Sequence, residues 1–522
     1  MMLSYQINQI LTKIRLLNRH KFSGFLYPIM KKNFTHALLA TWITLGVFSG
    51  QACGKKSTAN PTTPTKPVDP PVTPTTSDVA MWLTTADQTV AFTKQTTPIN
   101  FSTAAGTGTT INVDAGTTYQ TIDGFGFCLT GGSASVINAM TAQKKDDLLK
   151  DLFSTDDNHI GISYLRISIG ASDLSATDYT YDEVTPGQTD VDLKNFSIDV
   201  EKTDLLPILK KILAINPNIK ILGSPWTAPT WMKLNTLGFN GFKGGTLNPS
   251  YYDAYAKYFV KYIQAMKAEG ITIDAVTPQN EPLNAYNNPA MYMESADQAN
   301  FVQNLGAAFK TAGLNTKIIV WDHNADNTQY PLDIFKNASA SAYVDGSAFH
   351  LYNGDINALQ AVHDAYPAKN LYFTEQYTPA NGGFGGDLNW HVTNLIVGAT
   401  RNWCRNVLEW NLATDPNYGP HTDGGCDVCK GALTINSASD VTRNVSYYII
   451  AHASKFVRPG AVRISSTAVG TLPNVAFKNT DGSKVLIVLN SSGSQQTFNF
   501  KIDGKSANST LAGGAVATYV WK

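Results

Sequence analysis

The feature that most constrains this chain is a run of eight short β-rich segments that alternate with helical patterns between residues 122 and 412. Eight strand–helix units in one run are typical of a (β/α)8 barrel, in which parallel strands close into a cylinder and the helices surround it. We therefore predict an α/β fold of the TIM-barrel type. The predicted strands are residues 122–127, 162–168, 219–224, 273–278, 317–322, 345–350, 371–375 and 407–412.

Two segments between these strands show clear helical periodicity. A helix over 203–215 gathers four apolar side chains on one face, and a helix over 253–270, ended by Gly270, gathers five. An open, doubly wound sheet is the alternative, but the run Gly124-Phe125-Gly126 lacks the third, helix-opening glycine of its usual phosphate-binding turn. The apolar positions are Leu206, Leu209, Ile212 and Leu213, then Tyr255, Phe259, Tyr262, Ile263 and Met266.

The two flanks of the barrel region have a different pattern. Residues 81–121 and 459–522 contain segments of alternating apolar and polar residues, and Asp-Gly, Ser-Gly and Gly-Gly turns separate those of the second flank. This alternation is typical of antiparallel strands. We predict that both ends of the folded chain combine into one small β-sandwich beside a barrel formed by residues 122–458.

The first 80 residues predict export. In residues 1–53, a basic stretch that begins at Met30 precedes an apolar run, as in a signal peptide, so we place the true translation start at Met30. A small residue precedes the lone Cys53, as in bacterial lipoproteins, and predicts a lipid anchor; plain secretion is the alternative. Residues 54–80 are rich in Pro and Thr and predict an extended spacer. We expect an outer-membrane lipoprotein that faces the periplasm or the cell surface.

Charge and composition exclude some functions. The 40 Lys and Arg residues balance the 40 Asp and Glu residues, so the chain lacks the basic excess that binding to nucleic acid requires. An apolar share of 43% indicates a globular protein rather than a disordered one. A neutral chain with 11% aromatic residues suits an uncharged substrate such as a carbohydrate. We expect a monomer.

The five cysteines do not form a disulfide framework. Cys426 and Cys429 have the spacing of half a zinc site, but no second pair follows, so a four-ligand zinc site is disfavoured. A local disulfide and two free thiols both remain open for this pair. We interpret Cys128 and Cys404 as structural.

Polar side chains follow the carboxyl ends of the predicted strands, where TIM barrels carry their catalytic groups. Glu281 follows the fourth strand and Glu375 ends the seventh, and two carboxylates across a barrel opening are what glycoside hydrolysis needs. A single strand-end Glu more often only pairs with a basic neighbour, but Pro282 behind Asn280 and Glu281 favours a turn that aims both side chains inward. The further candidates are Arg166, Trp226, Asp322, His323, His350, Tyr352, Glu409, Trp410 and Asn411.

Three of these candidates have a structural alternative. Arg166 can simply hold a carboxylate of the barrel interior, although an arginine near Glu375 would also keep that carboxylate ionised. Trp226 and Trp410 can be core residues or flat platforms for a pyranose ring.

Segments along nearly the whole of residues 82–522 resemble glycoside hydrolase family 30, which includes lysosomal glucosylceramidase and microbial β-1,6-glucanases. So many matching segments in the same order make the resemblance specific. The segments are GFGFCLTGGSA (124–134), YLRISIGASDLS (164–175), SPWTAPTWMK (224–233), TPQNEP (277–282), FHLYNGD (349–355), FTEQY (373–377), EWNLATDPNYGP (409–420) and YYIIAHASKFVRPGAVRI (447–464).

The resemblance implies a retaining enzyme with a barrel, a side β-sandwich, and no metal or organic cofactor. It implies that Glu281 in TPQNEP is the general acid/base and that Glu375 in FTEQY is the nucleophile. The implied substrate contacts are Asn280 to the sugar 2-hydroxyl, Tyr352 to the nucleophile, and Arg166, Trp226, His350 and Trp410 around the glycone.

One position departs from the family. Many members have an Asp after the threonine that corresponds to Thr130, and that Asp binds outer hydroxyls of the sugar, whereas this chain has Gly131. Asp173 is a candidate replacement at the barrel mouth, or it only caps a helix.

Family precedent and the predicted spacer favour endo-acting hydrolysis of extracellular β-1,6-glucan. The alternatives are a glucosylceramidase-like β-glucosidase, a β-xylosidase or β-1,6-galactanase, and a surface glycan-binding protein without activity. In an active enzyme, we expect the negative charge of Glu375 to raise the pKa of Glu281 so that it stays protonated.

Overall fold

The computed structural model describes residues 76–522, except for 105, 107, 157–158 and 239–240. The predicted signal peptide, the lipid anchor on Cys53 and nearly all of the spacer therefore lie outside the described residues. Within the described part of the chain, no helix combines the length and the apolar character needed to cross a membrane.

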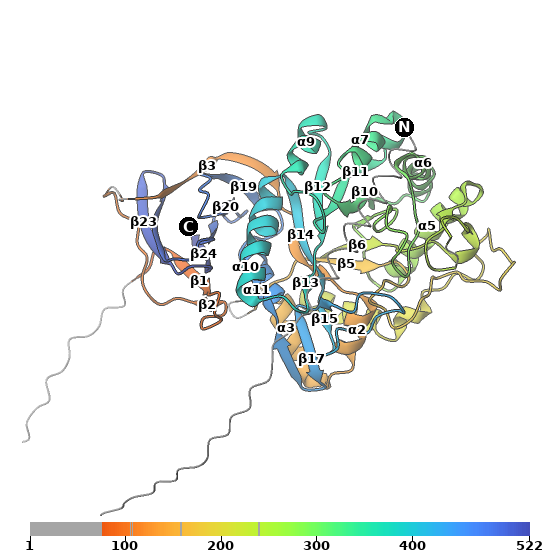
Figure 1. Ribbon diagram of the computed structural model, residues 1–522, viewed down its shortest axis with the longest axis horizontal. Coiled ribbons are helices and arrows are strands. Elements are labelled where there is room, and N and C mark those ends of the chain that lie inside the picture. Colours follow the sequence, from red (N-terminus) through yellow and green to blue (C-terminus); the bar gives the residue numbers. More distant parts are fainter. Residues whose placement is uncertain (1–75, 105, 107, 157–158, 239–240) are drawn as a thin grey trace, which may run out of the picture. The chain divides into compact units, whose positions relative to one another are not determined.

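The central element is a closed barrel, and each of the eight predicted strands supplies one of its strands (Figure 1). Neighbouring strands pair in parallel around the ring, which confirms the TIM-barrel prediction and excludes an open sheet. The strands are β4 (Gly124–Cys128), β5 (Tyr164–Ser168), β6 (Lys220–Ser224), β9 (Ala275–Val276), β10 (Lys317–Asn324), β11 (Val344–His350), β12 (Asn370–Glu375) and β14 (Cys404–Asn411).

Side chains fill the interior of the barrel. Seven of the eight strands each contribute one buried residue to an apolar cluster in which every member is at most 2% exposed. Burial of a side chain the size of Leu or Ile stabilises the fold by about 1.5–3 kcal/mol, and the packed layer leaves no pore. The members are Tyr164, Leu222, Ala275, Ile319, Ala348, Tyr372 and Leu408.

The two predicted helices are confirmed. Helix α4 (Leu205–Ile215) buries its predicted apolar face, with Leu213 only half-buried, and α5 (Tyr252–Ala268) buries all five predicted side chains. Gly270 follows α5 with a φ of 84°, a left-handed conformation that glycine adopts without strain. The other helices include α2 (Gly131–Asn138), α3 (Ala142–Phe153), α6 (Ser295–Thr311), α7 (Gln329–Lys336), α8 (Ala338–Ser341), α9 (Ala358–Ala365), α10 (Phe384–His391), a π-helix (Val392–Ala399) and α11 (Val445–Ser454).

Both flanks join in one nine-stranded sheet that folds into the predicted sandwich. Strand β1 from the first flank pairs antiparallel with β24 from the second, and the long β3 pairs with β19 through one half and with β22 through the other. These strands are β1 (Ala80–Thr84), β2 (Thr93–Lys94), β3 (Thr110–Thr121), β19 (Val462–Ser466), β20 (Asn474–Lys478), β21 (Lys484–Leu489), β22 (Gln496–Ile502), β23 (Lys505–Leu511) and β24 (Val516–Trp521).

The inner strands of the sandwich are buried on both faces. In β21, Leu486 and Val488 belong to the sandwich core, whereas Val485, Ile487 and Leu489 belong to the core that continues into the barrel. Helix α11 contacts both β4 of the barrel and β24 of the sandwich. The sandwich is therefore fixed to the barrel through a shared hydrophobic core.

Short strands lie within the loops that follow the carboxyl ends of the barrel strands. Strand β13 pairs with β16 just after β12, and β15, β17 and β18 form a small sheet after β14. Their bounds are β7 (Lys233–Leu234), β8 (Thr246–Leu247), β13 (Thr378–Pro379), β15 (Ala413–Thr414), β16 (Cys429–Lys430), β17 (Leu433–Ser437) and β18 (Asp440–Arg443).

Candidate active site

A cavity of about 530 Å³ opens where the barrel strands end. Glu281 and Glu375 both line it, together with aromatic side chains and the loop that follows β14. We call it the catalytic cavity. Its other lining residues include Asp173, Asn284, His323, Tyr352, Tyr377 and Trp410.

Glu281 is held in an unusual backbone conformation just after β9. Its φ is 43°, a left-handed value that costs a non-glycine residue energy. The Glu281 N–H donates to the carbonyl of Asp322 at 3.0 Å, and the amide of Asn284 donates to Glu281 Oε2 at 2.8 Å. These two bonds fix the carboxylate at the wall of the cavity.

Glu375 is the last residue of β12, and two donors fix its carboxylate. Arg166 Nη1 donates to Oε2 at 2.6 Å, and the hydroxyl of Tyr352 donates to Oε1 at 2.9 Å. Both carboxylate oxygens are thus oriented by groups from other segments, one on β5 and one in the loop after β11.

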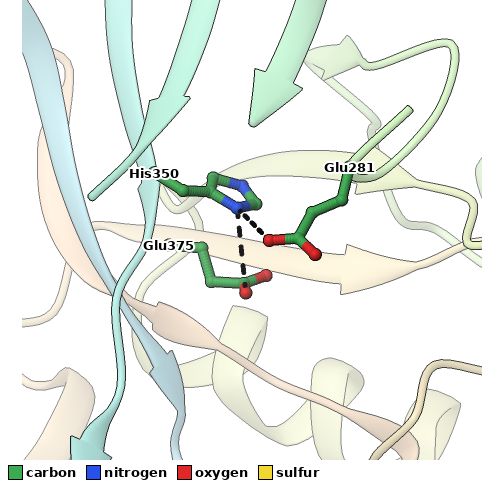
Figure 2. A group of neighbouring side chains, drawn as sticks. All are labelled: Glu281, His350 and Glu375. Atoms are coloured by element: carbon green, nitrogen blue, oxygen red, sulfur yellow. Dashed lines mark hydrogen bonds and ion pairs between the residues drawn. The ribbon is translucent and has the colours of Figure 1, made fainter. Parts of the chain in front are cut away.

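His350 faces both glutamates, and dashed lines in Figure 2 join its ring nitrogen to each carboxylate. Its Nδ1 is 3.1 Å from Glu281 Oε1 and 3.9 Å from Glu375 Oε1. One oxygen of each glutamate and one nitrogen of His350 all lie within 4.8 Å of one another. Two side chains that are 94 positions apart in the sequence therefore meet across the barrel opening.

Arg166, in β5, is fully buried beneath the cavity and donates to four acceptors, of which Ser224 Oγ, at 3.3 Å, is the most distant. Besides Glu375, its Nη2 donates to Asn280 Oδ1 at 2.6 Å and to Asp322 Oδ2 at 2.8 Å. Because Oδ1 of Asn280 is engaged, Nδ2 is the donor which that amide presents. Burial disfavours the charge of Arg166, but Asp322 and Glu375 outweigh it and raise the pKa of the guanidinium.

Asp322 is the functional residue whose importance sequence reasoning missed. Fully buried, it accepts from Arg166, Ser224 and Thr277 through Oδ2 and from Thr374 through Oδ1, with His350 Nε2 at 3.2 Å from Oδ1. The sequence places Asp322 at the end of the fifth predicted strand. The residues next to it give no sign that side chains from five strands meet at its carboxylate.

The two candidate tryptophans form one pair. The rings of Trp226 and Trp410 lie 5.4 Å apart, and the Arg166 guanidinium is 4.8 Å and 5.7 Å from their centroids. Trp410 lines the catalytic cavity, whereas Trp226, 1% exposed, packs behind it. Trp226 therefore fits the role of a core residue, and Trp410 fits that of a flat platform for a pyranose ring.

The structure brings all eight predicted site residues together in two layers. Glu281, Glu375, Tyr352 and Trp410 line the catalytic cavity. The remaining four lie beneath or beside them and contact them or one another through the bonds and ring contacts described above. They are Arg166, Trp226, Asn280 and His350.

The protonation pattern differs from the prediction. Burial raises the pKa of Glu281, but the hydrogen bond to His350 and the charges of His323 and His350 outweigh burial and lower it to about 2. The pKa of Glu375 is raised, chiefly by burial and also by the charges of Glu281 and Asp322, although His350 and Arg166 oppose the shift. The expected increase at Glu281 was wrong because the bridging imidazole was not foreseen.

His350 carries the proton in this arrangement. Burial disfavours its charge, but Glu375 and the hydrogen bonds to Asp322 and Glu281 raise its pKa to about 9. The surrounding acids thus favour a proton on the Glu281–His350 pair, whose nearest atoms, Glu281 Oε1 and His350 Nδ1, lie 3.1 Å apart.

The same three side chains could also provide ligands to a cation, because Glu281, His350 and Glu375 each offer one ligand atom in a compact group. Nδ1 of His350 would have to lose its proton and its contact with Glu281 to do so. The three side chains can therefore share a proton as they stand. They could bind a metal ion only after His350 rearranged.

The structure also shows the surroundings of Gly131. A Cβ atom at Gly131 would come within 3.1 Å of Ser175 Oγ, and Thr130 caps α2 by accepting from the N–H of Ser133 at 3.0 Å. Asp173, two residues before Ser175, lines the catalytic cavity, and no described residue donates a hydrogen bond to its Oδ1. Burial and the charges of Glu375 and Glu281 raise its pKa to about 7.

Cys426 and Cys429 are joined by a disulfide, which decides between the two alternatives left open above. Both cysteines line the catalytic cavity, and Cys429 packs against Trp410. The disulfide therefore closes a short loop at the wall of the site. Cys128 and Cys404 are buried free thiols.

Comparison with known proteins gives the same assignment over most of the chain. The family model of the glycosyl hydrolase family 30 TIM-barrel domain matches residues 122–457, and that of the family's β-sandwich domain matches residues 460–519. A solved endo-β1,6-glucanase is 40% identical, with a TM-score of 0.80, and the match covers 85% of this chain and 99% of that one.

Two curated relatives show the range of the family. An endo-1,6-β-D-glucanase of Neurospora crassa is 38% identical over 392 residues, 72% of this chain and 80% of that protein. The lysosomal acid glucosylceramidase of Mus musculus is 27% identical over 445 residues, 80% of this chain and 84% of that protein. The chain belongs to glycoside hydrolase family 30 and is an enzyme that hydrolyses glycosidic bonds of a carbohydrate substrate.

Proposed function

We propose that this protein is an endo-acting β-1,6-glucanase that works by retaining double displacement. The observation that carries the mechanism is the close approach of the two carboxylates, with one oxygen of Glu281 and one of Glu375 within 4.8 Å of each other. Retaining glycosidases need a carboxyl separation of about 5–5.5 Å, whereas inverting enzymes leave about 6.5–9.5 Å for a water molecule. The preference for β-1,6-glucan rests on relatives of this activity at 38% and 40% identity.

Glu375 is the proposed nucleophile. Arg166 stabilises the ionised form of its carboxylate through the bond to Oε2, and the Tyr352 hydroxyl orients Oε1. Attack on the anomeric carbon forms a glycosyl ester and breaks the bond to the leaving oxygen. Asn280 Nδ2 is positioned to donate to the 2-hydroxyl of that sugar, a contact that strengthens in the transition state.

Glu281 is the proposed general acid/base, and His350 supplies the proton it needs. In the unliganded site that proton resides on His350, one hydrogen bond away. A bound sugar excludes water from the cavity and disfavours the separated ion pair, so the proton moves to Glu281 and leaves both groups neutral. Glu281 then protonates the leaving oxygen and later removes a proton from the attacking water.

Asp173 is the proposed acidic partner of the sugar. Its buried carboxylate has an acceptor oxygen to which no described residue donates, and it lines the catalytic cavity. A buried polar atom without a partner is costly, and a sugar hydroxyl would satisfy it. In a 1,6-linked chain, hydroxyls 3 and 4 of the ring are the free candidates.

We also propose that the enzyme is exported and held at the outer membrane by a lipid on Cys53, with the Pro/Thr-rich segment as a spacer. A substrate that is an extracellular polysaccharide supports this location. Replacement of Cys53 by Ser should release the protein into the soluble fraction, and unchanged membrane fractionation of that variant would contradict the anchor.

Parallel assays of pustulan, a linear β-1,6-glucan, and of an aryl β-glucoside test the proposed activity. Release of a ladder of oligosaccharides from pustulan is the expected result. Cleavage of the aryl glucoside alone would indicate a glucosidase of the glucosylceramidase type, and binding of pustulan without turnover would indicate a glycan-binding protein.

A further inference from the structure

A second cavity of about 400 Å³ adjoins the catalytic cavity. It lies over the segments that follow β11 and β12 and reaches α10, at the same end of the barrel. The two cavities share Tyr352 and Tyr377 in their walls. We call it the side cavity.

The wall between the two cavities is one pair of aromatic rings. Tyr352 and Tyr377 lie 5.3 Å apart, centroid to centroid, with an interplanar angle of 36°. The hydroxyl of Tyr352 is bonded to Glu375, so the side cavity begins one ring away from the nucleophile. A chain bound at Glu375 therefore reaches the side cavity by passing over these two rings.

Trp390, in α10, lines the side cavity. It is 39% exposed, whereas the site tryptophans Trp226 and Trp410 are nearly fully buried. Its aromatic surface is open to water beside the cavity and is available to stack against a ligand. The apolar C–H face of a pyranose ring covers such an indole and leaves the sugar hydroxyls at its edge for polar groups.

Polar groups in the side cavity complement the hydroxyls of a sugar. Gln376 is only 8% exposed, and no described residue donates a hydrogen bond to its Oε1. Asp387 also lines the cavity and offers a second acceptor. An aromatic platform with hydrogen-bond acceptors beside it is the chemistry that recognises a neutral sugar ring.

We propose that the side cavity is a second sugar subsite, which binds a further glucosyl residue of the chain held at Glu375, with the ring stacked on Trp390. This inference rests on the proposed glucanase function and adds to it where the chain extends beyond the reacting sugar. It explains why an enzyme with a compact catalytic cavity would act within a long chain.

The test compares the full-length wild type and Trp390→Ala on linear β-1,6-linked glucose oligomers of two to six units and on pustulan. The wild type should show a rise in kcat/KM at the chain length that first fills the subsite. Because the variant loses the surface on which the further sugar stacks, it should lose about tenfold in kcat/KM, through KM, on the longer chains only.

Two controls separate subsite loss from general damage. Trp390→Phe keeps a platform and should retain most of the rise. Tyr343→Ala removes another exposed aromatic side chain, 37% exposed, just before β11 at the opposite end of the barrel, and should leave the chain-length profile unchanged.

The outcomes are distinct. Equal chain-length profiles for wild type and Trp390→Ala, or an equal loss on every chain length, would overturn the subsite. A wild type that cleaves an aryl β-glucoside but no β-1,6-linked oligomer would overturn the proposed function, and this inference with it.

Discussion

The two ends of the barrel both carry charged side chains around a cavity, yet they are built differently. At the amino-terminal end, three acids each have a basic partner: Asp123 with Arg405, Asp274 with Lys220, and Asp345 with Lys317. These basic side chains are 21–40% exposed, and the cavity there is about 390 Å³.

At the carboxyl-terminal end, the charges are buried and do not balance. Four acids share two fully buried basic groups, with the half-buried His323 beside them, and a fifth acid at this end, Glu409, pairs with His391. Burial, together with the charges of neighbouring acids, raises the pKa values of Asp173 and Glu375, and the acids raise the pKa of His350 against burial. At the other end, each of the three acids has its own basic partner. Both ends carry charged side chains and a cavity. What distinguishes the carboxyl-terminal end is its excess of buried acidic side chains. The four acids are Asp173, Glu281, Asp322 and Glu375, and the two basic groups are Arg166 and His350.

The largest loss of activity is expected from removal of one of the two proposed catalytic carboxylates. Glu375→Gln is nearly isosteric but lacks the nucleophile, so kcat should fall by at least about a thousandfold, and Glu281→Gln should lose about 10²–10⁴-fold on substrates with poor leaving groups. Initial rates on pustulan measure both effects. Near-normal turnover by Glu375→Gln would refute its role.

Asp322→Asn tests whether buried Asp322 positions Arg166 and His350 in the active site. Removal of one partner from a buried ion pair costs about 3–5 kcal/mol, so thermal unfolding should shift down clearly and kcat should fall about a hundredfold. Because Asp322 acts through Arg166 and His350, the alkaline limb of the pH profile should also move. A variant with wild-type pH dependence and only lower stability would make Asp322 merely structural.

The pH profile tests the shared proton. Activity requires Glu375 ionised and one proton on the Glu281–His350 pair. As the pH falls through the raised pKa of Glu375 the nucleophile becomes protonated, and as it rises through about 9 the pair loses its proton, so kcat/KM should be bell-shaped. His350→Gln should move the alkaline limb, and an unmoved limb would contradict proton storage on His350.

Asp173→Asn tests the proposed contact between Asp173, at the edge of the acidic cluster, and a sugar hydroxyl. Loss of one charged hydrogen bond to a hydroxyl should lower kcat/KM about tenfold or more. A 3-deoxy or 4-deoxy sugar at the reacting position should be penalised in the wild type and much less in the variant. Asp178→Asn, a half-buried carboxylate in the same loop that does not line the cavity, is the matched control. An undiminished deoxy penalty in the variant would exclude the contact.

The smallest effect is expected at the opposite end. Asp274→Asn removes the partner of Lys220, which lies 3.6 Å away and is 38% exposed. Such pairs contribute about 0–1 kcal/mol, so activity should stay within twofold and the melting temperature should barely change. A large loss of activity would show that the two ends are not separable in function.

The fold was predictable because its signals are local. The eight strands and helices α4 and α5 follow from periodicity, and the sandwich from alternation and turns, all of which were confirmed. That Glu281 and Glu375 meet at the barrel opening was also predictable, since strand ends converge in a barrel.

The missed features depend on contacts between distant segments. Asp322 collects donors from five strands, and His350 alters the protonation of Glu281, neither of which any single motif encodes. The exposure of Trp390 in the side cavity depends on how α10 packs, and the sequence around it contains no pattern for that.

The most direct measurement is mass spectrometry of the enzyme after incubation with an activated 2-deoxy-2-fluoro-β-glucoside, which slows release of the sugar from the nucleophile. The account predicts loss of activity together with one fluoroglucosyl group on the peptide that contains Glu375, and no such label in Glu375→Gln. A label on another residue, or inactivation with no label, would contradict double displacement through Glu375.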